Sequence, residues 1–299
     1  MLDNLSIEIR ENEPLSKHST FKIGGAAKYA VFPKSTDELV SVLKAVKGCN
    51  YKYKIIGNGS NILFDDKGFD GIIIFTKRLC SVEYIHGGNT TKIKVDCGKS
   101  LTELASEAGK KHSLTGLEFA YGIPGTVGGA VYMNAGAYGG QMSDVVKETE
   151  YFDTISGEIC KISFEQHNFS YRHSLFAEHP EYIVLSTTLE LKEGNAEEIF
   201  DSMTKNMSSR RDKQPLEYPN AGSTFKRPEG YFAGKLIEDC GLKGYTVGGA
   251  QISEKHAGFT VNIGGATSSD VLSLIEHTKN TVKESFNVEL ENEIIYLPY

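Results

Sequence analysis

The spacing of apolar and polar positions along the chain predicts four amphipathic helices. The predicted segments are residues 36–48, the stretch opened by Ser100, residues 196–209 and residues 268–286. In the first segment Thr36 is the candidate N-cap and Gly48 the C-terminal glycine. Ser100 with Glu103 three residues later is a capping-box signature. The segment 268–286 has the most regular apolar stripe in the chain.

Strands are predicted by a short apolar run and by alternating patterns. These segments are 71–75, 91–96, 182–192, 257–263 and 288–298. In the last of them, alternation places Glu289, Glu291 and Glu293 on one face with Ile295 and Leu297. Helices and strands do not alternate regularly, and no GxGxxG motif joins a strand to a helix. We therefore expect an α+β fold with mixed sheets rather than a Rossmann fold, with a boundary near 193–210.

Composition and charge exclude several classes of protein. The chain has 39% hydrophobic and 24% charged residues, a net charge of −7 and no dominant basic tail, so we expect a soluble protein that does not bind nucleic acid. No apolar stretch approaches a membrane span, and the N-terminus has no signal-peptide pattern. The five cysteines form no CxxC pair and the eight histidines no HxxxH pair, so we expect no metal site and a cytoplasmic location.

Glycine is the unusual component. It supplies 31 of 299 residues, about a tenth, against a usual share of about 7%, and it clusters within 116–140 and 222–265. The tract 121–141 mixes glycine with apolar residues, which favours backbone lying against a long ligand, although a buried packing turn is the alternative. Residues 56–61, Ile-Gly-Asn-Gly-Ser-Asn, predict either a phosphate-binding nest or a tight turn between strands.

Charged residues mark three further candidates. Arg172, between Tyr171 and His173, is able to clamp a carboxylate, though most arginines are solvated surface residues. The region 209–228 places basic residues on both sides of 220–224; it either attracts a phosphorylated or carboxylated small molecule or is a solvated loop. A glutamate near the apolar end of the last strand is either a buried acid with a raised pKa or part of a charged edge strand.

Taken in order, these motifs resemble the UDP-N-acetylenolpyruvoylglucosamine reductase family, from residues 20–25 almost to the C-terminus. The motifs are IGNGSN (56–61), GIPGTVGGAVYMNAGAYG (122–139), SYRHS (170–174), NAGSTFKRP (220–228) and LENEI (290–294). The resemblance implies a cytoplasmic, monomeric flavoenzyme with non-covalent FAD and with NADPH as hydride donor. It would reduce UDP-N-acetylglucosamine enolpyruvate to UDP-N-acetylmuramate in peptidoglycan precursor synthesis.

The resemblance also implies domains. It predicts an FAD-binding fold of the vanillyl-alcohol-oxidase type in two subdomains, 1–75 (to which 288–299 returns) and 76–204. A substrate-binding domain would cover 205–287. Only about fifty residues separate Arg172 from Ser223, as in the shorter subclass that lacks a tyrosine-bearing loop over the substrate.

Roles for individual residues follow from the same resemblance. The implied catalytic residues are Arg172, Ser223 and Glu293, with Glu291 as the alternative to Glu293. The implied FAD-binding residues are Ile56, Gly57, Asn58, Gly59, Ser60, Asn61, Gly122, Ile123, Pro124, Gly125, Val127, Gly128, Gly129, Asn134 and Gly136. The implied substrate-binding residues are Tyr138, Arg172, Arg210, Lys213 and Lys226.

Two other functions remain open on the residues alone. A flavin oxidase of the same superfamily often holds FAD through His or Cys, but no His or Cys lies within 113–159. A non-catalytic nucleotide-binding protein would keep the glycine tracts without needing Arg172, Ser223 and Glu293 together. The presence of all three favours an enzyme.

Overall fold

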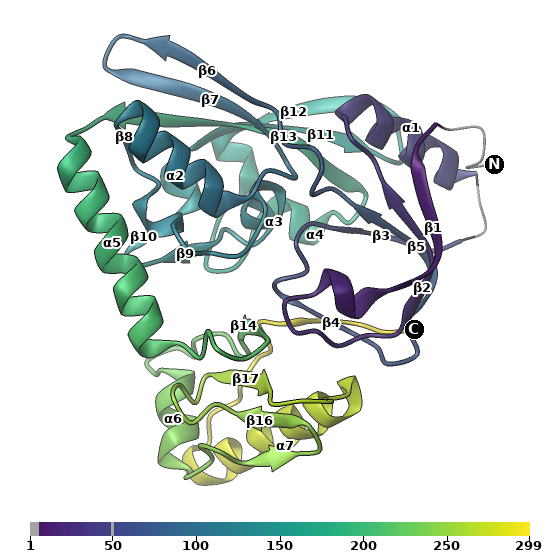
Figure 1. The fold of residues 1–299 in the computed structure, drawn as a ribbon, viewed down its shortest axis with the longest axis vertical. Helices are drawn as coiled ribbons and strands as arrows, with labels where there is room; N and C mark the ends of the chain where they lie inside the picture. The colour runs from purple at the N-terminus through teal and green to yellow at the C-terminus, as the bar shows by residue number, and fades with distance from the viewer. Residues whose placement is uncertain (1–5, 49–50) are drawn as a thin grey trace. The chain divides into compact units, whose positions relative to one another are not determined.

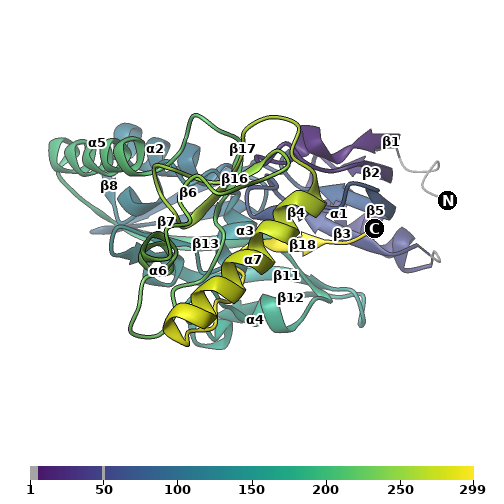
Figure 2. The ribbon, with the colours of Figure 1, turned by 90° about the horizontal axis from the view of Figure 1, so that it is seen from below.

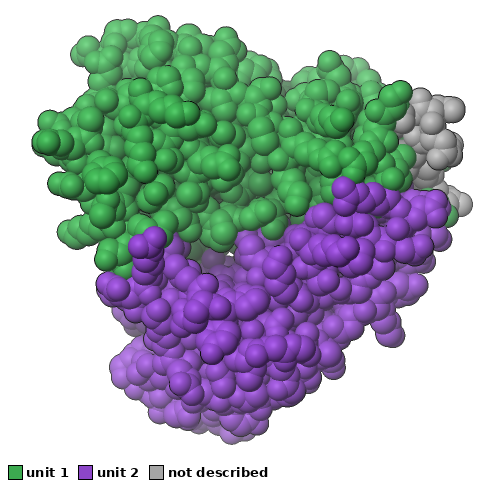
Figure 3. Space-filling model, in the orientation of Figure 1, with its two compact units in different colours: residues 1–9, 30–58, 73–209 green, residues 10–29, 59–72, 210–299 purple. Residues whose placement is uncertain are grey.

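The computed structural model describes residues 6–48 and 51–299, which form two compact units. Unit 1 comprises residues 1–9, 30–58 and 73–209, and unit 2 comprises residues 10–29, 59–72 and 210–299 (Figure 3). The division passes through strands of one four-stranded sheet, of order β1-β2-β5-β3. Its strands are β1 (Glu8–Pro14), β2 (Ala26–Phe32), β3 (Tyr53–Ile56) and β5 (Phe69–Phe75), and α1 (Thr36–Lys47) lies between β2 and β3 in the chain.

A six-stranded antiparallel sheet dominates unit 1. Its order is β12-β11-β13-β7-β6, and β8 pairs with β13 at one end (Figure 1). Its strands are β6 (Val82–Gly87), β7 (Thr90–Asp96), β8 (Leu114–Thr115), β11 (Val146–Asp153), β12 (Ile159–Ser163) and β13 (Tyr182–Glu193). One face carries ion pairs such as Lys94–Glu150 (2.9 Å), as expected for an antiparallel sheet with one solvated face.

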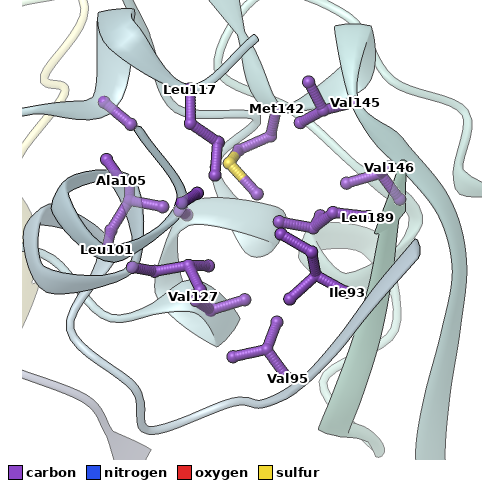
Figure 4. Close-up of a cluster of buried hydrophobic side chains, with 14 of the residues drawn as sticks. Ile93, Val95, Leu101, Ala105, Leu117, Val127, Met142, Val145, Val146 and Leu189 are labelled. Carbon is purple, nitrogen blue, oxygen red and sulfur yellow. The ribbon is translucent and has the colours of Figure 1, made fainter. Parts of the chain in front are cut away.

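The other face of this sheet packs against the helices of unit 1. Val95 of β7 and Leu189 of β13 meet Leu101, Ala105 and Val127 in a fully buried apolar cluster (Figure 4). The apolar residues of the helix recur every three or four positions, and those of the strands recur at every second position. The two sets of side chains therefore face each other and form one core. The remaining elements are α2 (Leu101–His112), α3 (Val127–Tyr132), β9 (Gly136–Ala137), β10 (Gly140–Gln141), α4 (Leu175–Glu178), α5 (Ala196–Lys213), η3 (Glu118–Ala120), η4 (Met142–Asp144) and η5 (Phe164–His167).

Unit 2 has its own core. A four-stranded antiparallel sheet of order β14-β17-β16-β15 packs against α7, whose buried stripe includes Val271, Leu274 and Val282 (Figure 2). The last strand, β18, pairs in parallel with β4, so the end of the chain returns to residues near position 62. The elements are η2 (Leu15–His18), β4 (Ile62–Phe64), β14 (Asn220–Ser223), α6 (Ala233–Asp239), β15 (Thr246–Val247), β16 (Ala250–Ile252), β17 (Phe259–Asn262), α7 (Ser268–Phe286) and β18 (Ile295–Leu297).

The predicted helices are confirmed, with one change at an N-cap. The helix predicted at 36–48 is capped by Ser35, whose side chain accepts from the backbone N–H of Glu38, so Thr36 is the first helical residue and not the cap. Ser100 caps α2 as predicted by accepting from the backbone N–H of Glu103.

The predicted final strand is mostly wrong. Only Ile295–Leu297 is a strand, because β4 offers just three residues to pair with. Upstream, Glu289 forms an ion pair with Lys283 (2.6 Å), and the chain is irregular. The charged residues of this segment therefore do not share one continuous strand face.

The four cysteines in the described residues are free thiols, whereas Cys49 lies outside those residues. None of the described helices combines the length and apolar character needed to cross a membrane. Residues 6–48 and 51–299 contain no cluster of three His, Cys, Asp or Glu side chains able to hold a metal.

Candidate functional site

The loop after β3 presents unpaired backbone donors. Among the described residues, no protein acceptor takes the backbone N–H groups of Gly57, Asn58, Gly59 or Ser60. Successive donors of this kind form a nest that binds an anion such as a phosphate. The glycines also have packing reasons, because a Cβ at Gly57 would lie 2.3 Å from Thr126 Oγ1.

Inside unit 1 this loop meets the long glycine tract. Asn58 Nδ2 donates to Pro124 O at 2.6 Å. The Thr102 hydroxyl holds the same stretch from the other side by donating to Ile123 O (2.7 Å) and accepting from Gly122 N (3.2 Å). Two motifs that lie more than sixty residues apart in the chain therefore form one surface.

Helix α3 shows which glycines the protein itself requires. A Cβ at Gly128 would lie 2.8 Å from Cys97 Cβ, and one at Gly136 would lie 2.8 Å from Gln141 Cβ. At Gly129 the nearest atom is Thr126 Oγ1 at 3.5 Å, which is an ordinary contact. Packing alone explains Gly128 and Gly136, whereas Gly129 leaves open space beside the helix.

Arg172 lies at the tip of a tight turn in unit 1. Its φ of 54° is in the left-handed region, which favours glycine or asparagine over arginine. Its Nη1 donates to Gly136 O at 3.4 Å, which links it to the end of the glycine tract. Tyr138, also predicted, is 44% exposed at the β9–β10 hairpin and has a φ of 52°.

Unit 2 brings Ser223 and Glu293 onto neighbouring segments. The backbone N–H of Glu293 donates to Thr224 O at 2.9 Å, directly after Ser223 at the end of β14. Asn61 Nδ2 donates to Glu293 O at 3.0 Å. The second half of the 56–61 motif, the serine and the glutamate thus lie together within one unit.

The two candidate glutamates have different surroundings. The Glu291 side chain is 75% exposed and pairs with Lys226 Nζ at 3.1 Å. Glu293 is half-buried and lies beside Thr224. These surroundings favour Glu293 over Glu291 as the acid. The ion pair with Glu291 also involves Lys226, one of the predicted substrate-binding residues.

The basic cluster lies at the end of α5 in unit 2. Arg210 is buried, and its Nη1 donates to Gln214 Oε1 at 3.2 Å. Lys213 is exposed one turn later. Lys213 is therefore accessible to a diphosphate from solvent, whereas the buried Arg210 is not.

Sequence reasoning missed several polar residues that hold these segments. Thr20 Oγ1 donates to Asn220 O at 2.7 Å, and Thr102 supports the glycine tract through Ile123 O and Gly122 N. Such pairings join residues up to 200 positions apart, so no local pattern indicates them. A cavity of about 610 Å³ in unit 2 was also not predicted, and none of the candidate residues lines it.

Comparison with known proteins identifies the class first. The FAD binding domain model matches residues 27–163, and the chain has an FAD-binding fold together with an α+β domain. The protein is therefore a flavoprotein, and the α+β expectation is confirmed.

The family follows from the second domain and from relatives over the whole chain. The family model "UDP-N-acetylenolpyruvoylglucosamine reductase, C-terminal domain" matches residues 214–297. The reductase of Caldanaerobacter subterraneus subsp. tengcongensis is 49% identical over 95% of this chain and 91% of its own length. That of Caldicellulosiruptor saccharolyticus is 48% identical over 99% of this chain and 94% of its own. The crystal structure of UDP-N-acetylenolpyruvylglucosamine reductase from Thermus caldophilus matches with a TM-score of 0.81 and 34% identity, covering 98% of this chain and 99% of that chain.

The chain belongs to the UDP-N-acetylenolpyruvoylglucosamine reductase family, and the resemblance read from its motifs is confirmed. The site fits FAD on structural grounds. Residues 57–60 offer backbone donors for its pyrophosphate, and at Gly129 only Thr126 Oγ1, at 3.5 Å, lies within 4 Å of where a Cβ would be.

Proposed function

We propose that Arg172, Ser223 and Glu293 carry the reaction of this family. That reaction is the FAD-dependent reduction of UDP-N-acetylglucosamine enolpyruvate to UDP-N-acetylmuramate with NADPH, a step in peptidoglycan precursor synthesis. The observation that supports the proposal is the backbone hydrogen bond from Glu293 N to Thr224 O (2.9 Å), because Thr224 follows Ser223 in the chain.

In this proposal the FAD is held by two motifs, residues 56–61 and the glycine tract, which are linked by the hydrogen bond from Asn58 to Pro124. Residues 56–61 would hold its pyrophosphate through backbone N–H groups, and residues 122–129 and Gly136 would line the flavin. When bound, FAD would supply the chemistry of hydride transfer between NADPH and the enolpyruvyl double bond.

The protein groups act on the charge and the proton. Hydride addition to the terminal carbon leaves enolate-like charge delocalised into the carboxylate. Arg172 would stabilise that charge together with Glu293, the glutamate being protonated or hydrogen-bonded. Ser223 gives a proton to the adjacent carbon. A free serine hydroxyl is a weak acid, so neighbouring polar groups must polarise it.

We further propose that Tyr138, Arg210, Lys213 and Lys226 bind the UDP-sugar, and that the cationic residues attract its diphosphate.

We propose the same three domains as the sequence predicts. Two FAD-binding subdomains cover 1–75 (with 288–299) and 76–204, and a substrate-binding domain covers 205–287. We also propose that the enzyme acts as a monomer. It works in the cytoplasm on small molecules, without nucleic acid or membrane partners, in keeping with its net charge of −7.

The Ser223→Ala variant tests the proton-donor role. Flavin reduction by NADPH should stay within about twofold of the wild-type rate, while product formation falls by about 10²–10⁴-fold, the usual contribution of a positioned acid. Ser273→Ala, an exposed serine on α7, is the matched control and should change neither rate.

Stopped-flow absorbance measures the two half-reactions separately. Equal losses in both half-reactions, or product formation at the wild-type rate, would refute the role of Ser223. Reoxidation mainly by oxygen rather than by the UDP-enolpyruvyl sugar in the wild type would refute the assigned reaction itself.

A further inference from the structure

The turn that carries Arg172 is strained and needs outside support. Ser170 and His173 exchange two backbone hydrogen bonds of 3.2 Å each, which leaves Tyr171 and Arg172 as the two central residues. A positive φ at the second central position is normally occupied by glycine or asparagine. An arginine keeps a positive φ, here 54°, only when contacts with the surrounding structure hold the backbone in place.

Asn134 provides that support from the glycine tract. Its Nδ2 donates to Ser170 O at 3.0 Å and more weakly to Gln141 Oε1 at 3.4 Å, and its Oδ1 accepts from Ser143 N at 3.0 Å. The residue is 2% exposed, so these hydrogen bonds form away from water and are costly to break.

A second bond holds the other side of the turn. Ser174, fully buried, donates its hydroxyl to Tyr132 O at 2.8 Å. Residues 132–134 are therefore attached to both sides of the turn, one on each side of Arg172. Two residues further along, Gly136 O accepts from the Arg172 guanidinium.

We infer that Asn134 is a positioning residue for Arg172, holding the strained turn so that the guanidinium is presented in one orientation. The inference rests on the proposed role of Arg172 in the reaction. This role is different from a direct contact of the Asn134 side chain with FAD. Both the NH₂ group and the oxygen of that side chain already have hydrogen-bond partners in the protein.

Asn134→Asp removes the hydrogen bond to Ser170 O and places a carboxyl group opposite that carbonyl. Aspartate has nearly the same shape, tolerates a positive φ and keeps an acceptor for Ser143 N, but it loses the donor to Ser170 O. The matched control is Asn168→Asp, since Asn168 also has a positive φ (50°) and lies four residues before Arg172, with an exposed side chain.

The test is a double-mutant cycle with Arg172→Ala, measured as single-turnover flavin reoxidation by the UDP-enolpyruvyl sugar. Asn134→Asp should slow reoxidation about 10–100-fold in the wild-type background, as expected for a small displacement of a reacting group, and less than threefold in the Arg172→Ala background. The rate of flavin reduction by NADPH and the flavin absorbance spectrum should not change. Asn168→Asp should stay within twofold throughout.

Equal losses in the two backgrounds, or a matching loss in flavin reduction or FAD affinity, would overturn the inference while leaving the role of Arg172 intact. Wild-type reoxidation in Arg172→Ala would instead refute the proposed role of Arg172, and the inference with it. If Asn134→Asp does not yield folded holoenzyme, the same cycle with Ser174→Ala, which cuts the other attachment, decides between these outcomes.

Discussion

Two adjacent glycines in helix α3 differ in what surrounds them, and this difference predicts opposite effects of the same substitution. An added Cβ at Gly128 would lie 2.8 Å from Cys97 Cβ and 3.1 Å from Cys97 O, both closer than van der Waals contact. Neither atom is the end of a flexible side chain, so the helix or the strand end must move. At Gly129 the nearest atom is Thr126 Oγ1 at 3.5 Å, and nothing needs to move.

The magnitude follows from two opposing terms. Replacing glycine by alanine in a helix gains at most about 1 kcal/mol in propensity, and this gain is similar at both positions. Overpacking costs about 1–3 kcal/mol and applies only at Gly128. The propensity gain cancels in the comparison, so Gly129→Ala should exceed Gly128→Ala in free energy of unfolding by about 1–3 kcal/mol.

Urea denaturation of the apo-proteins, followed by circular dichroism, measures this difference through the transition midpoints. An FAD titration followed by flavin fluorescence provides the second measurement. Because the space beside Gly129 is where we place the flavin, Gly129→Ala should weaken FAD binding at least tenfold despite its more stable apo-protein. Equal or reversed midpoints would refute the packing argument, and unchanged FAD affinity in Gly129→Ala would refute the placement of the flavin.

Two further predictions concern pH. Hydrogen bonds from Thr267 N and, more weakly, Gly249 N hold the pKa of Asp270 below its ordinary value of 3.8, so its contribution to stability is complete above that value and is lost as the pH falls through the lower folded pKa. Asp270→Ala should cost about 1 kcal/mol in urea denaturation at pH 7 and progressively less as the pH falls below 3.8, and a cost that does not decline with pH would contradict this. Burial lowers the pKa of His167 below 6.5, although its Nδ1 contacts Ser163 O at 2.8 Å. The unfolded chain therefore binds the proton first, stability falls as the pH drops below about 6.5, and His167→Gln should remove this part of the pH dependence between pH 7.5 and 5.5.

Local patterns were sufficient for the helices because their signals are local. The stripe of α7 and the Ser100 cap of α2 need only residues three or four positions apart, and both appear where they were predicted. The cap of α1 shifted by one residue because Ser35 and Thr36 are both suitable, and only the backbone conformation decides between them.

The last strand shows where the pattern was insufficient. Alternation over 288–298 is compatible with a long strand, but strand length depends on the partner, and β4 pairs with only Ile295–Leu297. The preceding glutamates are then free to form ion pairs with Lys283 and Lys226.

Glycine content was the most ambiguous signal. The density of the tract 121–141 indicated a ligand, but the structure gives Gly128 and Gly136 packing reasons of their own. A sequence cannot distinguish a glycine that makes room for a ligand from one that makes room for a neighbouring strand, because both remove the same Cβ.

The sequence by itself determined the types of the main elements, the α+β class and the family, because periodicity and ordered motifs are properties of the chain alone. Only the tertiary structure decided that Asn58 contacts Pro124, that Asn134 supports the Arg172 turn and that Glu293, not Glu291, lies beside Thr224. The bond between Asn134 and Ser170 joins residues 36 positions apart, and the bond between Asn61 and Glu293 joins residues 232 positions apart. They depend on the path of the whole chain, which no local pattern encodes.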